Sequence, residues 1–249
     1  MKQQILDSSH YFSLGRTDFF SPYILKLVFL PLLFSILFWG AIFYFFGGVA
    51  FDWLYSFVDL DFSFSFKILL WIQSGLNFII KLSLIALFVV AFYVFVMLSN
   101  LAFCGFLTPF VVSYVHKTHY EANPLFDDFG IVHILFFLLK TYLLYFIFLL
   151  LLLPFYFIPL LGALLILFLN YWLFYKTLAM DAGERIFTKE KFRGALMLYK
   201  NKIRGVVLPL YGLSLIPILN FFIPFYALIV LVHLFFYLQS KELANADSN

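Results

Sequence analysis

The stretch that most constrains the fold is residues 141–175, which carry no Asp, Glu, Lys or Arg between Lys140 and Lys176. A straight helix over this run would rise about 50 Å at 1.5 Å per residue. The hydrocarbon core of a bilayer is about 30 Å thick, so one straight span does not fit. The run must therefore fold back on itself.

The middle of this run supplies the break. Pro154 and Pro159 each lack a backbone donor and clash with the preceding helical turn. Gly162 permits positive φ, which suits a tight turn. We therefore predict a helical hairpin over residues 134–180, with both of its ends on the same side of the membrane.

A second run, residues 205–240, also lacks Asp, Glu, Lys and Arg. At its centre, Ile216-Pro217, two aliphatic residues and Asn220 follow the same order as Ile158-Pro159, two aliphatic residues and Gly162. Asn and Gly both tolerate left-handed backbone. Two interpretations stay open: a duplicated hairpin, or two unrelated apolar runs that each needed a turn.

The arms of the second hairpin are short. Residues 205–216 would rise about 18 Å as a helix, too little to cross a core of about 30 Å. We therefore expect arms that penetrate the membrane halfway. The polar backbone of their turns cannot face lipid, so it must be covered by protein or line a wet cavity. This requirement predicts a homo-oligomer, a pore, or both.

Composition agrees with a membrane location. The chain is 65% hydrophobic and only 12% charged, whereas a soluble domain has about 25% charged residues. These values predict an all-α integral membrane protein. The single Cys104 excludes an intrachain disulfide. A net charge of +3, with no basic patch on a soluble fold, gives no reason to expect a nucleic-acid partner.

We expect a single membrane domain over residues 1–249, made of two long transmembrane helices and two hemi-penetrating hairpins. Its segments are an N-terminal interfacial segment (1–21), a first transmembrane helix (22–46), a second long helix region (67–111), the first hairpin (134–180), a basic cytoplasmic segment (181–204) and the second hairpin (205–240).

Local signals set the boundaries of the two long helices. Ser21 suits the N-cap of the first helix and Pro22 its first helical position. Gly47-Gly48 is expected to end that helix. Residues 59–66 alternate with period two, which in a membrane protein indicates an extended loop. Polar and turn-forming residues within 99–109 predict that the second helix returns to the headgroup region there.

The distribution of charge predicts the orientation. Residues 181–204 hold seven Lys or Arg, and such segments stay in the cytoplasm. Because both hairpins return to their starting side, residues 112–140, 176–204 and both termini should be cytoplasmic. The loop at 47–66 has Asp but no Lys or Arg, and it should lie outside.

A set of short motifs occurs in order along nearly the whole chain. They are Leu30-Pro31-Leu32-Leu33, Thr108-Pro109-Phe110, Tyr156-Phe157-Ile158-Pro159 with Gly162, Asp181, and Ile216-Pro217-Ile218-Leu219-Asn220 with Pro224. In order and spacing this set resembles the CysZ-type sulfate permease family, which is grouped with the etoposide-induced membrane proteins. The resemblance implies an oligomeric bacterial inner-membrane protein with two long helices and two hemi-penetrating hairpins, which passes sulfate inward.

The resemblance also implies a place for the anion. The family's sulfate site lies at the start of the first long helix, in a Pro-Gly-Leu-Arg-Arg-like motif. Residues of this chain at or beside that motif are Arg16, Ser21, Pro22, Tyr23, Ile24 and Lys26. Tyr23 replaces the glycine and Leu25 the first arginine, whereas Pro22 matches and Lys26 keeps the charge of the second arginine. A helix N-terminus attracts anions by itself; the competing interpretation is simple anchoring by Arg16 and Lys26.

Three histidines are the remaining candidates for chemistry. His116 and His119 are three residues apart on one predicted helix face, a spacing that can hold a metal, but no further ligands are evident. A solvated helix face is the preferred interpretation. His233 lies in an apolar arm, where a packed, hydrogen-bonded core histidine is preferred over a proton relay.

Two amides and a set of three charged residues lie in or beside the hairpins. Asn170 and Asn220 are expected to cap or to bond helix to helix rather than to contact solute. Asp181, Glu184 and Arg185 are expected to form a local ion-pair set where the first hairpin ends.

The sequence thus predicts an anion permease or channel for a sulfate-like oxyanion that does not hydrolyse ATP. The alternative is a non-transporting assembly or lipid-interaction protein on the same scaffold. Oxyanion, membrane lipid and further copies of the chain are the expected partners. No enzyme motif, catalytic residue, cofactor fingerprint or metal site is expected.

Overall fold

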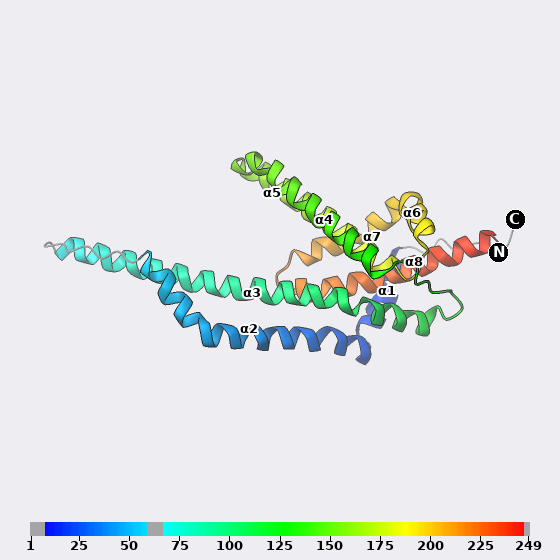
Figure 1. Cartoon of the computed structure of the whole chain (residues 1–249), viewed down its shortest axis with the longest axis horizontal. Helices are drawn as coiled ribbons and strands as arrows, with labels where there is room; N and C mark the ends of the chain where they lie inside the picture. The colour runs from blue at the N-terminus through cyan, green and yellow to red at the C-terminus, as the bar shows by residue number, and fades with distance from the viewer. Residues whose placement is uncertain (1–7, 59–66, 247–249) are drawn as a thin grey trace. The chain divides into compact units, whose positions relative to one another are not determined.

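The computed structural model describes residues 8–58 and 67–246. Its elements are α1 (Ser8–Phe19), α2 (Pro22–Ser56), α3 (Lys67–His119), α4 (Ile131–Leu151), η1 (Leu153–Phe157), α5 (Pro159–Gly183), α6 (Lys189–Leu198), α7 (Lys200–Ser214), η2 (Leu219–Phe221) and α8 (Ile223–Ala246) (Figure 1). Within these two ranges there is no strand. Helices α2, α3, α4, α5 and α8 are long and apolar enough to cross a membrane. The chain is therefore an all-α membrane protein, as predicted.

The chain divides into two compact units. Unit 1 comprises Met1–Val28 and Cys104–Asn249, and unit 2 comprises Phe29–Phe103. The division falls inside α2 and α3, which each contribute to both units.

Unit 2 is a pair of helical segments joined by aromatic contacts. The Trp39 indole N–H donates to Ser99 Oγ at 2.8 Å, and its ring stacks on Phe95 with centroids 4.4 Å apart. Phe43 meets Phe92 edge to face. Many other large apolar side chains are exposed, as Trp71 is, which suits a surface that faces lipid or another protein.

The first long helix does not end at Gly47-Gly48. Helix α2 continues to Ser56, ten residues beyond the predicted end at residue 46. Contacts with α3 hold this extension: Phe51 packs against Phe88, and the Lys81 ammonium lies 4.9 Å from the Tyr55 ring centroid. These contacts offset the helix-weakening effect of the glycines, about 1 kcal/mol each. The extended loop predicted at 59–66 lies outside the described residues.

The turn signals at residues 99–109 do not interrupt the second long helix, and the return of these residues to the headgroup region stays a prediction. Helix α3 is continuous from Lys67 to His119, with Pro109 inside it. Thr108 Oγ1 donates to the Cys104 carbonyl at 3.1 Å, so part of the local hydrogen bonding comes from a side chain. Where water is absent, backbone N–H and C=O groups need partners within the protein, and a continuous helix provides them. This requirement outweighs the turn signals.

Unit 1 is built around α8. Most of its side chains are buried, including Phe225, Leu228 and Phe235, because α1, α5 and α7 pack around it. A helix that is apolar on every side suits such a central place. Polar side chains on α8 are therefore interior groups that need partners.

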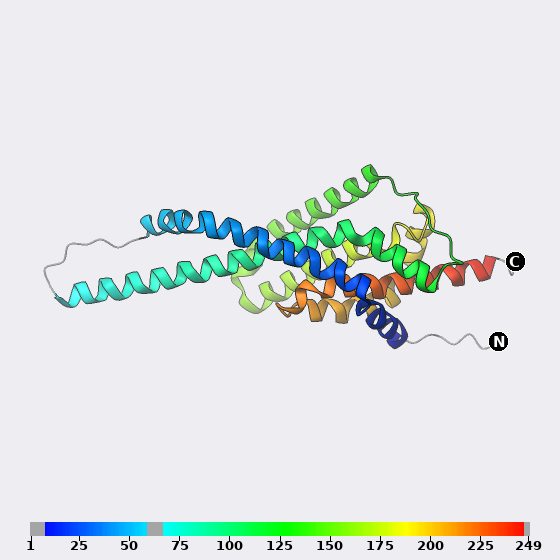
Figure 2. The same ribbon diagram turned by 90° about the horizontal axis from the view of Figure 1, so that it is seen from below.

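Both predicted hairpins are present in unit 1. Helices α4 and α5 form the first around η1, and α7 and α8 form the second around η2. In both views the open ends of the hairpins and the loop before α4 lie at one end of unit 1, and the closed ends lie at the other (Figures 1 and 2). Tyr145 Oη donates to Asn170 Oδ1 at 2.8 Å, which confirms the helix-to-helix role expected for this asparagine.

The arms differ in length. Helices α4 and α5 have 21 and 25 residues, or about 32 and 38 Å, enough to cross a membrane. Helix α7 has 15 residues, or about 22 Å, which is too short. The other arm of the second hairpin, α8, has 24 residues and is long enough to cross. The length of α7 therefore supports half-penetration by the second hairpin, which stays a prediction, and the first hairpin is long enough for either depth.

The two Ile-Pro motifs do not hold equivalent places. Pro159 lies in the first turn of α5, whereas Pro217 precedes η2, before the second arm begins. The structural counterpart of Pro159 is Pro224, near the start of α8. Both segments form helical hairpins, but the two Ile-Pro motifs that suggested a duplication occupy different positions in them.

Gly162 serves close packing rather than a left-handed turn. None of the described residues, Asn220 included, has positive φ. Gly162 lies inside α5, where a Cβ atom would come within 2.8 Å of Tyr156 Cα. The absence of a side chain lets the turn that contains η1 fold back onto the start of α5.

We predict that Gly162→Ala lowers the free energy of unfolding by about 1–2 kcal/mol, because the added methyl meets backbone that cannot easily move. Thermal unfolding of the detergent-solubilised protein would measure this. The control is Gly212→Ala, where a Cβ meets nothing within 4 Å, so the change should be neutral or stabilising. Equal behaviour of the two variants would contradict the packing role of Gly162.

Candidate functional site

The start of α2 has the predicted cap. Ser21 Oγ accepts the Ile24 backbone N–H at 3.3 Å, and Pro22 is the first residue of the helix. The Ser21 N–H in turn donates to the Asp18 carbonyl at 3.0 Å, which fixes the turn between α1 and α2. The predicted helix start is confirmed.

The residues expected to bind an oxyanion lie around this cap. Arg16, on α1, and Lys26, on α2, are both exposed. Tyr23 stacks on Tyr114 with centroids 5.2 Å apart. The Ile24 side chain is fully buried, so only its backbone could face a ligand, and its N–H already serves the cap. Anion binding by Arg16, Ser21, Pro22, Tyr23, Ile24 and Lys26 stays a prediction.

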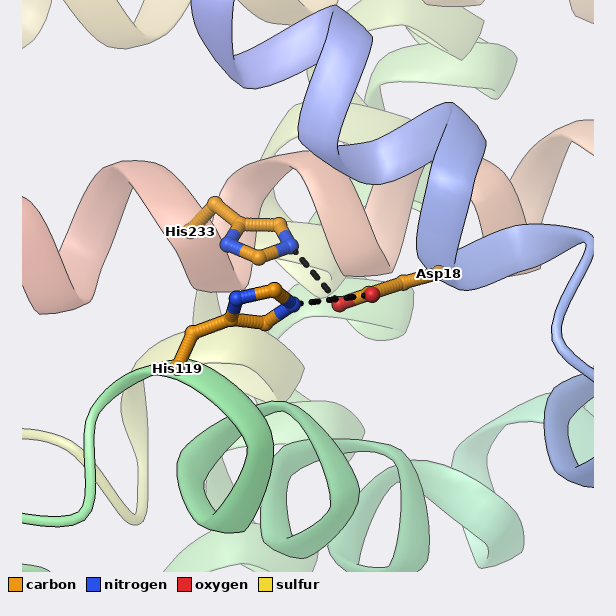
Figure 3. A group of neighbouring side chains, drawn as sticks. All are labelled: Asp18, His119 and His233. Carbon is orange, nitrogen blue, oxygen red and sulfur yellow. Dashed lines mark hydrogen bonds and ion pairs between the residues drawn. The ribbon is translucent and has the colours of Figure 1, made fainter.

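One turn before the cap, Asp18 joins two histidines that are remote in sequence. Asp18 Oδ1 lies 2.9 Å from His119 Nε2, and Asp18 Oδ2 lies 3.0 Å from His233 Nε2 (Figure 3). The three side chains come from α1, α3 and α8 and point toward one another. Asp18 and His233 are buried, whereas 28% of the His119 side chain is exposed.

A tyrosine completes the cluster. Tyr120 Oη lies 3.1 Å from His233 Nδ1, so both ring nitrogens of His233 have partners. Burial alone would raise the pKa of Asp18, but hydrogen bonds from His233 and His119 outweigh it and hold this pKa below its ordinary value. Burial raises the pKa of Tyr120 to about 12, with the charge of Asp18 adding to the effect. The cluster therefore contains an ionised carboxylate and a neutral phenol.

This cluster corrects one sequence interpretation and confirms another. The solvated helix face preferred for His116 and His119 is wrong, because both histidines have protein partners: His116 Nε2 lies 2.8 Å from the Asn123 carbonyl oxygen, and His119 Nε2 lies 2.9 Å from Asp18 Oδ1. His233 is the buried, hydrogen-bonded histidine that the sequence predicted. Asp18 was missed, because it lies 101 residues from His119 and no local pattern connects them.

The expected ion-pair set at the end of the first hairpin is not observed. In the part of the chain that the structure describes, the ion pairs are those of Asp18 with the two histidines, and none joins Glu184 to Arg185. Burial raises the pKa of Glu184 to about 7, the nearby Arg185 opposes this shift, and Asp127 adds to it. Glu184 is thus half-buried with no ion-paired cation among the described residues, and the predicted ion-pair set does not form.

Glu184 gives a prediction about pH. Its folded pKa of about 7 lies above the value of 4.5 for the free side chain, so the folded state holds its proton more tightly. Its contribution to stability is therefore full below about pH 4.5 and is lost as pH rises through 7. We expect Glu184→Gln to raise the melting temperature relative to wild type at pH 8 but not at pH 5. The exposed Glu121→Gln should shift neither; a gain from Glu184→Gln that is the same at both pH values would contradict the assignment.

A cavity of about 950 Å³ opens among α4, α5, α6 and α7, within unit 1. Its lining includes six cationic side chains and one carboxylate, Glu190. The cations are Lys140, Lys176, Lys189, Arg193, Lys200 and Arg204. The rest of the wall is mostly apolar, with groups such as Phe137, Leu144 and Trp172, and it also includes His133 and Thr141. The sequence marked 181–204 as basic, but it did not show that Lys140 and Lys176 share one cavity with it.

Comparison with known proteins assigns the chain to a family. A family model described as sulfate transporter CysZ/etoposide-induced protein 2.4 matches residues 11–224, from α1 to the first turn of α8. Searches of curated proteins and of solved structures returned no match. The match covers most of both units, including the cavity and three members of the Asp18 cluster, Asp18, His119 and Tyr120. The chain therefore belongs to the sulfate transporter CysZ/etoposide-induced protein 2.4 family.

Proposed function

We propose that this protein is a permease or channel that passes a sulfate-like oxyanion through a bacterial inner membrane without hydrolysing ATP. The observation that carries the proposal is the basic cavity, where six Lys or Arg side chains meet a single carboxylate. Clefts lined by charge of one sign concentrate counter-ions and speed their entry. The family match supports the same substrate class.

The position of the cavity suits entry or exit of the anion. Lys140 and Lys176 flank the charge-free run of the first hairpin, and both line the cavity. Lys140 lies in the middle of α4 and Lys176 two turns before the end of α5, and long lysine side chains can extend their ammonium groups toward the membrane interface. If residues 176–204 are cytoplasmic, as the positive-inside rule predicts, the cavity opens to the cytoplasm and both termini lie on that side.

The start of α2 is a second place for the anion in this proposal. Arg16 and Lys26 supply charge on either side of the capped helix N-terminus, where the helix dipole favours anions. The exposed apolar side chains of unit 2 suit lipid or further copies of the chain. We propose a homo-oligomer in which neighbouring copies cover the turns of the hairpins.

A lipid-interaction protein on the same scaffold is the second candidate. The cavity combines basic groups with an apolar wall that includes Trp172 and Met180. Basic pockets between membrane helices are also suited to anionic lipid head groups. In this alternative the cavity would hold a lipid and no ion would cross.

Uptake of radiolabelled sulfate into proteoliposomes tests the proposal. Liposomes with the protein should accumulate sulfate faster than protein-free liposomes, and unlabelled sulfate should compete. Lys26→Ala should lower the rate if the start of α2 also binds the anion. No uptake above protein-free liposomes, together with co-purification of a stoichiometric anionic lipid, would favour the second candidate.

A further inference from the structure

We propose that Asp18, His119 and His233 form a binding site for a divalent first-row transition-metal ion such as Zn²⁺. This inference concerns α1, α3 and α8, and it does not depend on transport. It also departs from the sequence-based expectation of no metal site.

The geometry supplies three convergent ligand atoms. One ligand atom from each of Asp18, His119 and His233 lies within 4.8 Å of the other two, and both histidines point Nε2 at the carboxylate. Zinc binds imidazole nitrogen and carboxylate oxygen at about 2.0–2.2 Å, so an ion between them requires small side-chain rotations. Two histidines and one carboxylate are a common set for Zn²⁺ and other borderline metals.

Charge favours a cation at this place. The Asp18 side chain is only 4% exposed, and among the described residues the basic groups within ion-pair distance of it are the two imidazoles. If both imidazoles are neutral, the cluster carries an uncompensated negative charge in the interior, which is costly. A divalent ion bound by neutral imidazoles and the carboxylate removes that cost.

The surroundings of His233 suit a metal ligand. When Nε2 binds an ion, Nδ1 carries the proton and needs an acceptor, and Tyr120 Oη lies 3.1 Å away in that position. The Tyr120 ring is itself held by stacking on Phe236, with centroids 4.8 Å apart and planes at 15°. A partner of this kind fixes the orientation of a ligating imidazole and its tautomer.

The site also has a way in. With 28% of its side chain exposed, His119 connects the buried Asp18 and His233 to solvent. An ion could enter on this side and keep a water molecule as its remaining ligand, as open zinc sites do. Bound metal would tie the N-terminal helix α1 to α3 and α8.

Metal titration of the full-length, untagged protein tests the proposal. After treatment with a chelator, the detergent-solubilised protein should bind a single Zn²⁺ per chain, and Zn²⁺ should raise its melting temperature. His119→Ala should weaken binding by more than about 100-fold, and Tyr120→Phe by about 10-fold. Co²⁺ should give the visible absorption of a low-coordinate nitrogen and oxygen site, which His119→Ala abolishes.

The matched control is His133→Ala, an exposed histidine outside the cluster, which should bind Zn²⁺ as wild type does. Asp18→Asn is a second variant, but its burial makes misfolding a risk; His119 is exposed enough for its variant to fold. Zn²⁺ binding that is absent in wild type, or that is equal in wild type and His119→Ala, would overturn the proposal and leave a hydrogen-bonded cluster without metal.

Discussion

Replacing Lys176 and Arg204 together by glutamine is expected to lower sulfate uptake into proteoliposomes by about 10-fold or more. The two residues lie on α5 and α7 and supply two of the six cations that line the basic cavity. A divalent anion responds strongly to local potential, and charged clefts change ion capture by about 10- to 1,000-fold. The effect should shrink at high ionic strength, because salt screens the cavity.

The control variant also removes two positive charges, but from residues that do not line the cavity. Lys117 and Lys191 are exposed and are not among its lining residues, so Lys117→Gln with Lys191→Gln should leave uptake nearly unchanged. Lys191 shares α6 with Lys189, which does line the cavity. If both double variants lowered uptake equally, only the overall charge of the protein would matter, and the role of the cavity would be refuted.

Gly15→Leu is expected to lower the free energy of unfolding by about 3 kcal/mol, the upper part of the range for overpacking. Helix α1 crosses α8 at this glycine, where a Cβ atom would come within 2.5 Å of Val230 Cγ2. Val is stiff at χ1, so it cannot easily turn away. Moving α1 outward would also draw Asp18 away from His233.

Two further variants make this prediction specific. Gly105→Leu is the control, because a Cβ atom there meets nothing within 4 Å. Gly15→Ala should be destabilising alone and should be partly rescued by Val230→Ala, which removes the methyl group it meets. Chemical unfolding in detergent measures both effects. Additive destabilisation in the double variant would show that the α1–α8 contact does not limit stability at Gly15.

The sequence predicted the features that local physics controls. A charge-free run longer than a membrane is thick, interrupted by Pro154 and Pro159, can only fold back, and it does. Ser21-Pro22 starts a helix because capping depends on neighbouring residues. The prediction that Gly47 and Gly48 end the first long helix is wrong, because packing of the following turns on α3 outweighs the low helix propensity of glycine.

The candidate sites were largely hidden in the sequence for the opposite reason. Asp18 and His233 lie 215 residues apart, and only the crossing of α1 over α8 brings them together. The basic cavity likewise gathers cations from four helices, of which the sequence indicated only the 181–204 part. Long-range contacts of this kind leave no periodic signal in a single sequence.

We propose that both hairpins leave the membrane by the face they entered, so that Lys140, Lys176, Arg204 and Lys241 share one side. Single cysteines at Lys140, Lys176, Arg204 and Lys241, in a Cys104→Ala background, would test it with a membrane-impermeant thiol reagent. All four should be labelled from the cytoplasmic side only, and a cysteine at Asp52 from the opposite side only. Labelling of Lys140 and Lys176, or of Arg204 and Lys241, from opposite sides would contradict the account.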